Sequence, residues 1–290
     1  MIRDFFIVNL QTKKRVFHKS YSKEPTPESI VKSFLLKYSK EFILDEEEFN
    51  PVKIIPIKQY MFTFQVRPNS DSVFMIVSDI HDSKKDMELL LSRVTTSLSN
   101  FNYQQGMTKN QHSELDVIIT KNLFSQIKIA LIGKDNVGKS AIFNQLEGEI
   151  SLTHSKRVMR SKQIFSQSTD PKVYLLDYIG TEDYSPQWPN LLHGVHIILI
   201  VVDSTVENVL STKRLFINLV KKAKPDALIL GIANKQDQPK SLDAQLIQKM
   251  LDIDEVFPLS MYRLTNPKTL ENIFLHAVQK YLAQFLTLSS

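Results

Sequence analysis

One eight-residue segment limits the fold of this chain more than any other feature. Residues 133–140 read GKDNVGKS and fit G-x-x-x-x-G-K-[ST], the pattern of a loop that binds phosphate groups. An apolar strand expected at 127–132 leads into the loop, and a helix expected at 139–147 leads out of it. Amides and the positive end of that helix favour an anion. A strand, a glycine-containing loop and a helix in this order indicate an α/β domain.

Glycine is rare in the rest of the chain, which gives the two glycines of this loop added weight. The chain has 7 glycines in 290 residues, well below the average usage of about 7%. We expect Gly133 to allow the sharp turn off the strand and Gly138 to let the backbone approach a phosphate. A chance match to the pattern is therefore improbable.

Other residues of the loop have predicted roles with a bound nucleotide. Lys139 supplies a positive charge to the β- and γ-phosphates, and the hydroxyl of Ser140 is a predicted Mg²⁺ ligand. The predicted nucleotide-binding residues here are Asp135, Asn136, Val137, Gly138, Lys139, Ser140 and Ala141.

A second motif specifies the base. Residues 234–237 (NKQD) follow a strand expected at 227–233. The carboxylate of Asp237 can accept hydrogen bonds from N1–H and the exocyclic amine of guanine, which adenine does not offer, so GTP and GDP are predicted. Asn234 is expected to tie this loop to the phosphate loop, and the stem of Lys235 to lie across the base. Ser260 and Met261 complete the predicted set, with the backbone amide at this point reading guanine O6.

A third piece follows the strand expected at 172–176. Asp177 lies at the carboxyl end of that strand, where a carboxylate holds Mg²⁺, usually through water. The amide of Gly180 is a predicted γ-phosphate ligand. The alternative for Asp177 is a solvated loop residue, and its spacing from Lys139 favours the metal.

Together these residues resemble the Arf family of small GTPases. Asp135 matches the third position of the Arf loop, and residues 177–203 align without a gap to the Arf segment from D-V-G-G to V-V-D-S, with Trp188 on the family's tryptophan. Residues 233–239 (ANKQDQP) are similar to A-N-K-Q-D-L-P. The resemblance covers about residues 127–285. It implies a P-loop small GTPase fold with a mostly parallel sheet, GTP/GDP and Mg²⁺ as cofactors, and regulators or effectors that bind at the switch regions.

The chain departs from the family where catalysis is expected. Thr181 stands at the position of the glutamine that orients the attacking water, and threonine is too short for that task. Glu182 is the neighbouring candidate to replace it. The resemblance therefore implies a GTPase with slow intrinsic activity. The switch I ligand of the metal is Thr153 or Ser155, without a motif to choose between them.

The same stretch is basic. Its cations are Lys156, Arg157, Arg160 and Lys162. The two interpretations are a solvated loop and a contact with an acidic partner or a membrane surface.

The first hundred residues predict a separate α+β domain with the order β-β-α-β-β-β-α. Its expected strands are 4–10, 15–21, 52–57, 60–66 and 72–77. One helix is expected from Pro27 with Thr26 as N-cap, and another from a cap at Asp82 or Ser83 to about Leu98. This order resembles a longin or roadblock fold, a non-catalytic platform that accompanies GTPases in trafficking and protein targeting.

The predicted organisation has three parts: a longin-like α+β domain at 1–101, a linker with an amphipathic helix at 102–126, and an Arf-like GTPase domain at 127–290. The helix is expected at 114–124, and both packing on the first domain and a nucleotide-dependent switch are open. In the last part, further strands are expected at 195–202 and 256–258, and further helices at 206–222, 241–251 and 267–285.

Composition narrows the partners and the compartment. The net charge of +5 is spread over the chain, whereas nucleic-acid binders concentrate it, so no nucleic-acid partner is expected. No apolar run reaches the ~20 residues of a membrane span, and the start of the chain lacks a signal-peptide pattern. With no cysteine, disulfides and lipid attachment to cysteine are excluded. We expect a cytoplasmic protein, and peripheral contact with a membrane surface stays open.

Two functions follow from these patterns. The first is a Mg²⁺-dependent regulatory switch of the Arf type between GTP- and GDP-bound states, in trafficking or protein targeting. The second is a hydrolysis-deficient, GTP-locked scaffold whose longin-like domain recruits partners, and Thr181 favours it.

Overall fold

The computed structural model describes residues 2–38, 42, 51–67, 71–80, 82–99, 101, 108–151, 159–165, 171–178, 192 and 194–286. The chain divides into two units. The first comprises Met1–Phe124 and Phe285–Ser290, and the second Ser125–Gln284. No helix in the described ranges is both long and apolar enough to cross a membrane.

The first unit is built on an antiparallel sheet in the order β2-β1-β5-β4-β3. Its strands are β1 (Ile2–Asn9), β2 (Arg15–Ser20), β3 (Lys53–Ile57), β4 (Tyr60–Arg67) and β5 (Ser72–Asp79). Its helices are α1 (Glu28–Lys37), α2 (Lys84–Ser97) and α3 (Lys109–Leu123). Up to α2, the order of elements along the chain is the β-β-α-β-β-β-α order predicted from the sequence.

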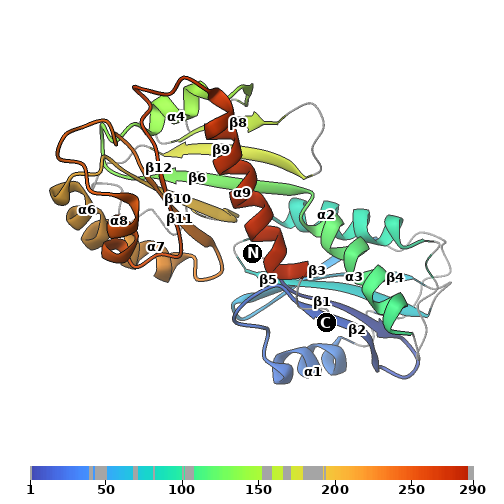
Figure 1. Ribbon diagram of the computed structural model, residues 1–290. Helices are drawn as coiled ribbons and strands as arrows, with labels where there is room; N and C mark the ends of the chain where they lie inside the picture. The colour runs from blue at the N-terminus through green and yellow to red at the C-terminus, as the bar shows by residue number, and fades with distance from the viewer. Residues whose placement is uncertain are drawn as a thin grey trace. The chain divides into compact units, whose positions relative to one another are not determined.

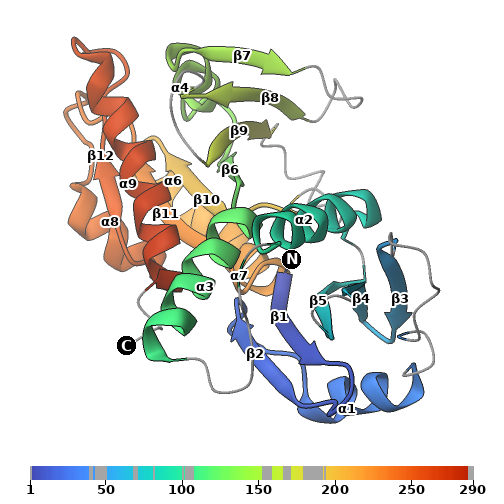
Figure 2. The ribbon, with the colours of Figure 1, turned by 90° about the vertical axis from the view of Figure 1, so that its right-hand side faces the viewer.

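Helices α1 and α2 cover opposite faces of this sheet (Figure 2). On one face, the ring of Phe34 in α1 stacks on that of Phe62, with centroids 4.3 Å apart, and meets Phe64 edge-on. On the other, the hydroxyl of Thr95 in α2 donates a hydrogen bond of 2.8 Å to Gln65. Because neighbours in a strand point to opposite faces, Phe64 and Gln65 place the two helices on the two sides.

The start of α1 differs from the prediction because another residue takes the N-cap position. The prediction of Thr26 as N-cap is wrong: Pro27 holds that position, and the amide of Thr26 instead donates to Asp4 Oδ2 at 2.7 Å. Of the two caps left open for α2, Ser83 accepts from the amide of Asp86.

Helix α3 begins at Lys109, five residues before the predicted start at 114. Thr108 and Gln111 form a capping box, in which each side chain bonds the backbone amide of the other. Part of the predicted linker is therefore helical, and α3 belongs to the first unit.

Asp4 supplies a test of pH-dependent stability. Its buried carboxylate accepts hydrogen bonds from His18 Nε2 at 2.9 Å and from the Thr26 amide. Burial raises the pKa of Asp4, but these hydrogen bonds outweigh it and bring the pKa below the ordinary value of 3.8. The folded state then binds fewer protons than the unfolded state, so this stabilisation is present above about pH 4 and is lost as the pH falls through the folded pKa.

We expect Asp4→Ala to lower the free energy of unfolding at pH 7 by about 1–3 kcal/mol, because the buried Thr26 amide loses its acceptor. Below pH 4, the free energy of unfolding of the variant should also fall less steeply than that of the wild type. Urea unfolding at pH 7 and pH 3 measures both effects. If the free energies of unfolding of variant and wild type differed equally at the two pH values, the role given to the Asp4 carboxylate would be contradicted.

The second unit contains a mostly parallel sheet in the order β12-β11-β10-β6-β9-β8-β7 (Figure 1). The parallel strands that the structure describes are β6 (Gln126–Ile132), β9 (Lys172–Tyr178), β10 (Ile197–Val202), β11 (Leu228–Ala233) and β12 (Val256–Pro258). Strands β7 (Gly148–Ser151) and β8 (Met159–Ile164) extend it antiparallel at one end. The sequence did not predict these two strands, because GEIS and MRSKQI lack a clear apolar pattern.

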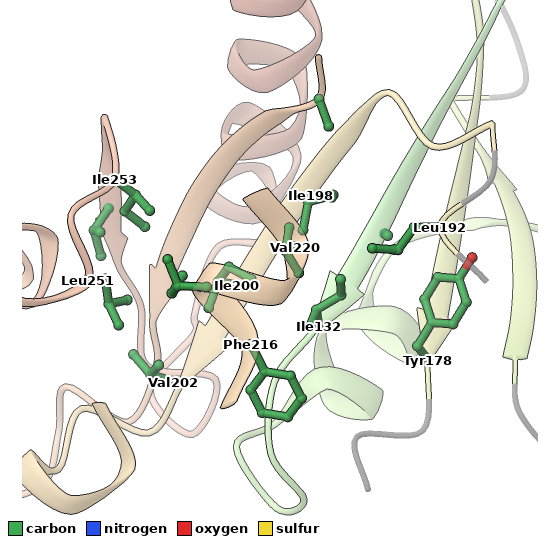
Figure 3. Packing of buried hydrophobic residues seen from close by; sticks show 14 of the residues in the cluster. Ile132, Tyr178, Leu192, Ile198, Ile200, Val202, Phe216, Val220, Leu251 and Ile253 are labelled. Atoms are coloured by element: carbon green, nitrogen blue, oxygen red, sulfur yellow. The ribbon is translucent and has the colours of Figure 1, made fainter. Parts of the chain in front are cut away.

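All six residues of β10 are buried, as in a strand covered on both faces. Ile198, Ile200 and Val202 pack in one cluster with Phe216 and Val220 (Figure 3). The helices in the described residues of this unit are α4 (Lys139–Gln145), α6 (Val206–Thr212), α7 (Asn218–Ala223), α8 (Ala244–Leu251) and α9 (Pro267–Leu286), whose last residues belong to the first unit.

The helix predicted as continuous over 206–222 contains a wider turn. A π-helical segment, Lys213–Ile217, joins α6 to α7. Helix α8 starts at Ala244 and not at the predicted 241, because the side chain of Asp243 caps it by accepting from the Leu246 amide.

Candidate functional site

The predicted phosphate loop joins β6 to α4. Gly138 is the N-cap of α4 with φ +105°, and a Cβ there would lie 2.2 Å from Asn234 Nδ2. At Gly133 a Cβ would lie 2.2 Å from the carbonyl oxygen of Val201. Both positions therefore exclude a side chain, and at Gly138 the close neighbour is a residue of the predicted base loop.

Lys139 is folded into this loop. Its Nζ donates to the carbonyl oxygens of Gly133 at 2.8 Å and Lys134 at 2.7 Å, and the residue is buried. Burial lowers the pKa of Lys139, while the charges of Asp177 and Asp135 oppose that effect. An ammonium group held in this desolvated position interacts with an anion more strongly than one in water does.

Asn234 connects three loops. Its Nδ2 donates to the carbonyl oxygen of Val137 at 2.8 Å, and its Oδ1 accepts from the amide of Met261 at 3.1 Å. Asn234 is buried, with 2% of its surface exposed. The phosphate loop, the NKQD segment and the Ser260 segment are thus brought together through one side chain.

Hydrogen bonds from neighbouring residues hold the predicted base loop, residues 234–237. Asp237 accepts a 2.5 Å hydrogen bond from the Ser260 hydroxyl, which lowers the pKa of Asp237 below its ordinary value. The buried Ser204 hydroxyl donates to Asn234 O at 2.6 Å, and Gln236 Nε2 donates to Ser204 Oγ at 2.7 Å. Asp237 is therefore ionised at neutral pH and held as a hydrogen-bond acceptor.

The predicted metal ligands also lie together. Ser140 Oγ donates to Asp177 Oδ2 at 3.3 Å. A hydroxyl and a carboxylate are the hard oxygen donors that suit Mg²⁺. The donor set of Ser140 and Asp177 fits that ion.

Several predicted residues lie outside the described part of the chain. They are Thr153, Ser155, Gly180, Thr181, Glu182, Trp188, Lys156 and Arg157. The predicted residues that the structure describes around this site are Asp135, Asn136, Val137, Gly138, Lys139, Ser140, Ala141, Asp177, Asn234, Lys235, Asp237, Ser260 and Met261.

Sequence reasoning missed the roles of two cations on β8. Neither interpretation of the basic stretch holds for Lys162, which is buried and donates to the carbonyl oxygens of Phe143 and Leu146, both at 2.9 Å, near the end of α4. Arg160 forms an ion pair with Asp177 Oδ2. The spacing of two residues between these cations was the available signal, since it puts both on one face of a strand.

Comparison with known protein families gives a match over most of the second unit and part of α3. Residues 115–276 match the ADP-ribosylation factor family. ADP-ribosylation factor-like protein 1 of Saccharomyces cerevisiae is 30% identical over 134 residues, which cover 45% of this chain and 72% of that protein.

Two other relatives show the same level of identity. ADP-ribosylation factor-like protein 4C of Homo sapiens is 30% identical over 145 residues, covering 48% of this chain and 76% of that protein. GTPase Era of Buchnera aphidicola is 30% identical over 158 residues, covering 50% of this chain and 54% of that protein. The chain thus spans only about half the length of the Era protein.

Proposed function

This chain belongs to the ADP-ribosylation factor family, and from that membership we propose that it is a guanine-nucleotide-binding regulatory protein that alternates between GTP- and GDP-bound forms. The contact that best supports the proposal is that of Asn234 with Val137 and Met261, because it joins the phosphate loop to the residues that would read the base. Lys139 would hold the β- and γ-phosphates, and Asp237 would accept the two donors of guanine.

Mg²⁺ is the proposed cofactor. Ser140 and Asp177 would hold it, Asp177 through water, with Thr153 or Ser155 as the proposed ligand from switch I. A bound Mg²⁺ would neutralise negative charge on the phosphates.

We propose that intrinsic hydrolysis is slow because Thr181 occupies the position of the water-orienting glutamine, with Glu182 as the nearest substitute. Thr181 also favours the second candidate, a scaffold that stays in the GTP-bound form. Nucleotide extracted over hours from protein loaded with GTP and Mg²⁺ tests the two: conversion to GDP supports the switch, and persistent GTP supports the scaffold or a switch that needs an activating partner. Failure to retain any guanine nucleotide would contradict both.

The first unit is proposed to be a longin-like platform that recruits partners. Its observed order of strands and helices, on which the resemblance rests, supports this role. We place the protein in the cytoplasm with peripheral contact at a membrane surface, in trafficking or protein targeting, with regulators and effectors that bind at the switch regions.

Restoring the water-orienting group should accelerate hydrolysis. We expect Thr181→Gln to raise single-turnover GTP conversion by about tenfold or more, because a carboxamide of that length can position water. Thr181→Asn is the matched control, since its amide is one methylene shorter, and its rate should stay near that of the wild type. An unchanged rate in Thr181→Gln would show that another group limits hydrolysis.

A further inference from the structure

The ion pair of Arg160 with Asp177 lies at the predicted metal site. The two residues are direct partners across the antiparallel pair β8 and β9, so their side chains share one face of the sheet. The guanidinium Nη2 donates to Asp177 Oδ2, the same oxygen that accepts from Ser140 Oγ. Arg160 and Ser140, a predicted metal ligand, therefore donate to the same oxygen of Asp177.

Packing holds this arginine in place without burying it. The guanidinium carbon lies 4.7 Å from the centroid of the Phe143 ring in α4, a cation–π distance. Lys162, two residues further along β8, binds carbonyl oxygens near the end of the same helix. The side chain of Arg160 is 46% exposed while that of Asp177 is only 6% exposed. The arginine can thus leave toward solvent, and the carboxylate stays where it is.

The ion pair of Arg160 with Asp177 would weaken the binding of a divalent cation at this carboxylate. A metal held by Ser140 and Asp177 needs the negative charge of this carboxylate, which the guanidinium partly neutralises through a charge-assisted hydrogen bond. Keeping Arg160 in place would also set a positive charge beside the metal. A metal-bound water that donates to Asp177 would therefore compete with Arg160 for this carboxylate.

We propose that Arg160 competes with Mg²⁺ for Asp177 and thereby sets the Mg²⁺ concentration at which the protein retains its nucleotide. Arg160 is a positioning residue in this role, because it acts through Asp177. The inference rests on the proposed function, since the metal would accompany bound GTP or GDP.

The test follows release of a fluorescent GDP analogue from the full chain across a series of free Mg²⁺ concentrations. We expect Arg160→Gln to reach half-maximal retention at about one tenth of the wild-type Mg²⁺ concentration, because the competing charged hydrogen bond is gone. Arg160→Lys keeps the charge without the planar guanidinium, so its Mg²⁺ midpoint should lie between those of Arg160→Gln and the wild type. In EDTA, release from Arg160→Gln should match that from the wild type, because the effect acts only through the metal.

Lys172→Gln is the matched control. It removes one positive charge from the exposed first residue of β9, five residues and about 17 Å of strand from Asp177, and should leave the Mg²⁺ dependence unchanged. Melting curves in EDTA check that each variant is folded. Should Arg160→Gln fail to fold, the shift between Arg160→Lys and the wild type decides the question.

Three results would overturn the proposal. An unchanged Mg²⁺ midpoint in folded Arg160→Gln would show that the ion pair does not compete with the metal. A raised midpoint, or faster release in EDTA, would show that Arg160 supports nucleotide binding directly. Failure of the wild type to bind a guanine nucleotide at any Mg²⁺ concentration would instead contradict the proposed function itself.

Discussion

Replacing Lys139 with alanine is expected to lower the affinity of the chain for GTP and GDP by on the order of 1,000-fold. The ammonium group is already buried in the phosphate loop, against the carbonyl oxygens of Gly133 and Lys134. Its charge-assisted bonds to phosphates would form where water screens them little. Equilibrium titration with a fluorescent GDP analogue measures the loss.

Lys172→Gln again provides the charge-matched control and should bind with wild-type affinity. Far-ultraviolet circular dichroism should show that Lys139→Ala keeps its secondary structure, since one loop side chain is changed. A Lys139→Ala protein that binds within a few-fold of the wild type would contradict the assignment of residues 133–140 as the phosphate loop.

Replacing Asp237 with asparagine is expected to weaken binding of GDP by on the order of a hundredfold or more, because the amide cannot accept from both guanine donors. The change keeps the size of the side chain and an oxygen that can accept from the Ser260 hydroxyl. Competition between GDP and ADP against a fluorescent nucleotide measures how much of the preference for guanine is lost.

Xanthosine diphosphate distinguishes lost recognition from a damaged loop. Xanthine carries a carbonyl oxygen where guanine carries its exocyclic amine, so the asparagine amide can donate to it while its carbonyl accepts from N1–H. We expect Asp237→Asn to bind this nucleotide more tightly than the wild type does. Retained preference for GDP in Asp237→Asn would remove Asp237 from the base site.

The strands that the sequence predicted correctly are those with a strong apolar pattern. β10 is buried along its whole length, and its run of branched residues marked it as a strand. β7 and β8 were missed because their residues are mostly polar, and pairing makes them strands: β8 pairs with β9, and β7 pairs with β8. Capping was the other source of error, as at Thr26, where the amide binds Asp4 far away in sequence.

The candidate site also has features that the sequence predicted and features that it missed. Motif spacing predicted that residues 133–140 and 234–237 would meet, since both follow strands of one parallel sheet, and Asn234 contacts both loops. The Arg160 pair with Asp177 depends on the register of β8 on β9, which no motif encodes. The roles of Thr181, Glu182, Gly180, Thr153 and Ser155 stay predictions.

The wide turn between α6 and α7 bears on how this chain is aligned with others. Each residue of a regular helix turns it by 100°, so one additional residue would rotate everything after it away from the sheet. The segment Lys213–Ile217 absorbs such a residue locally, and Val209 before it and Val220 after it both remain in the core. An insertion is thus accommodated without a change of buried face. When this helix is aligned with a homologue one residue shorter, the gap belongs within Lys213–Ile217.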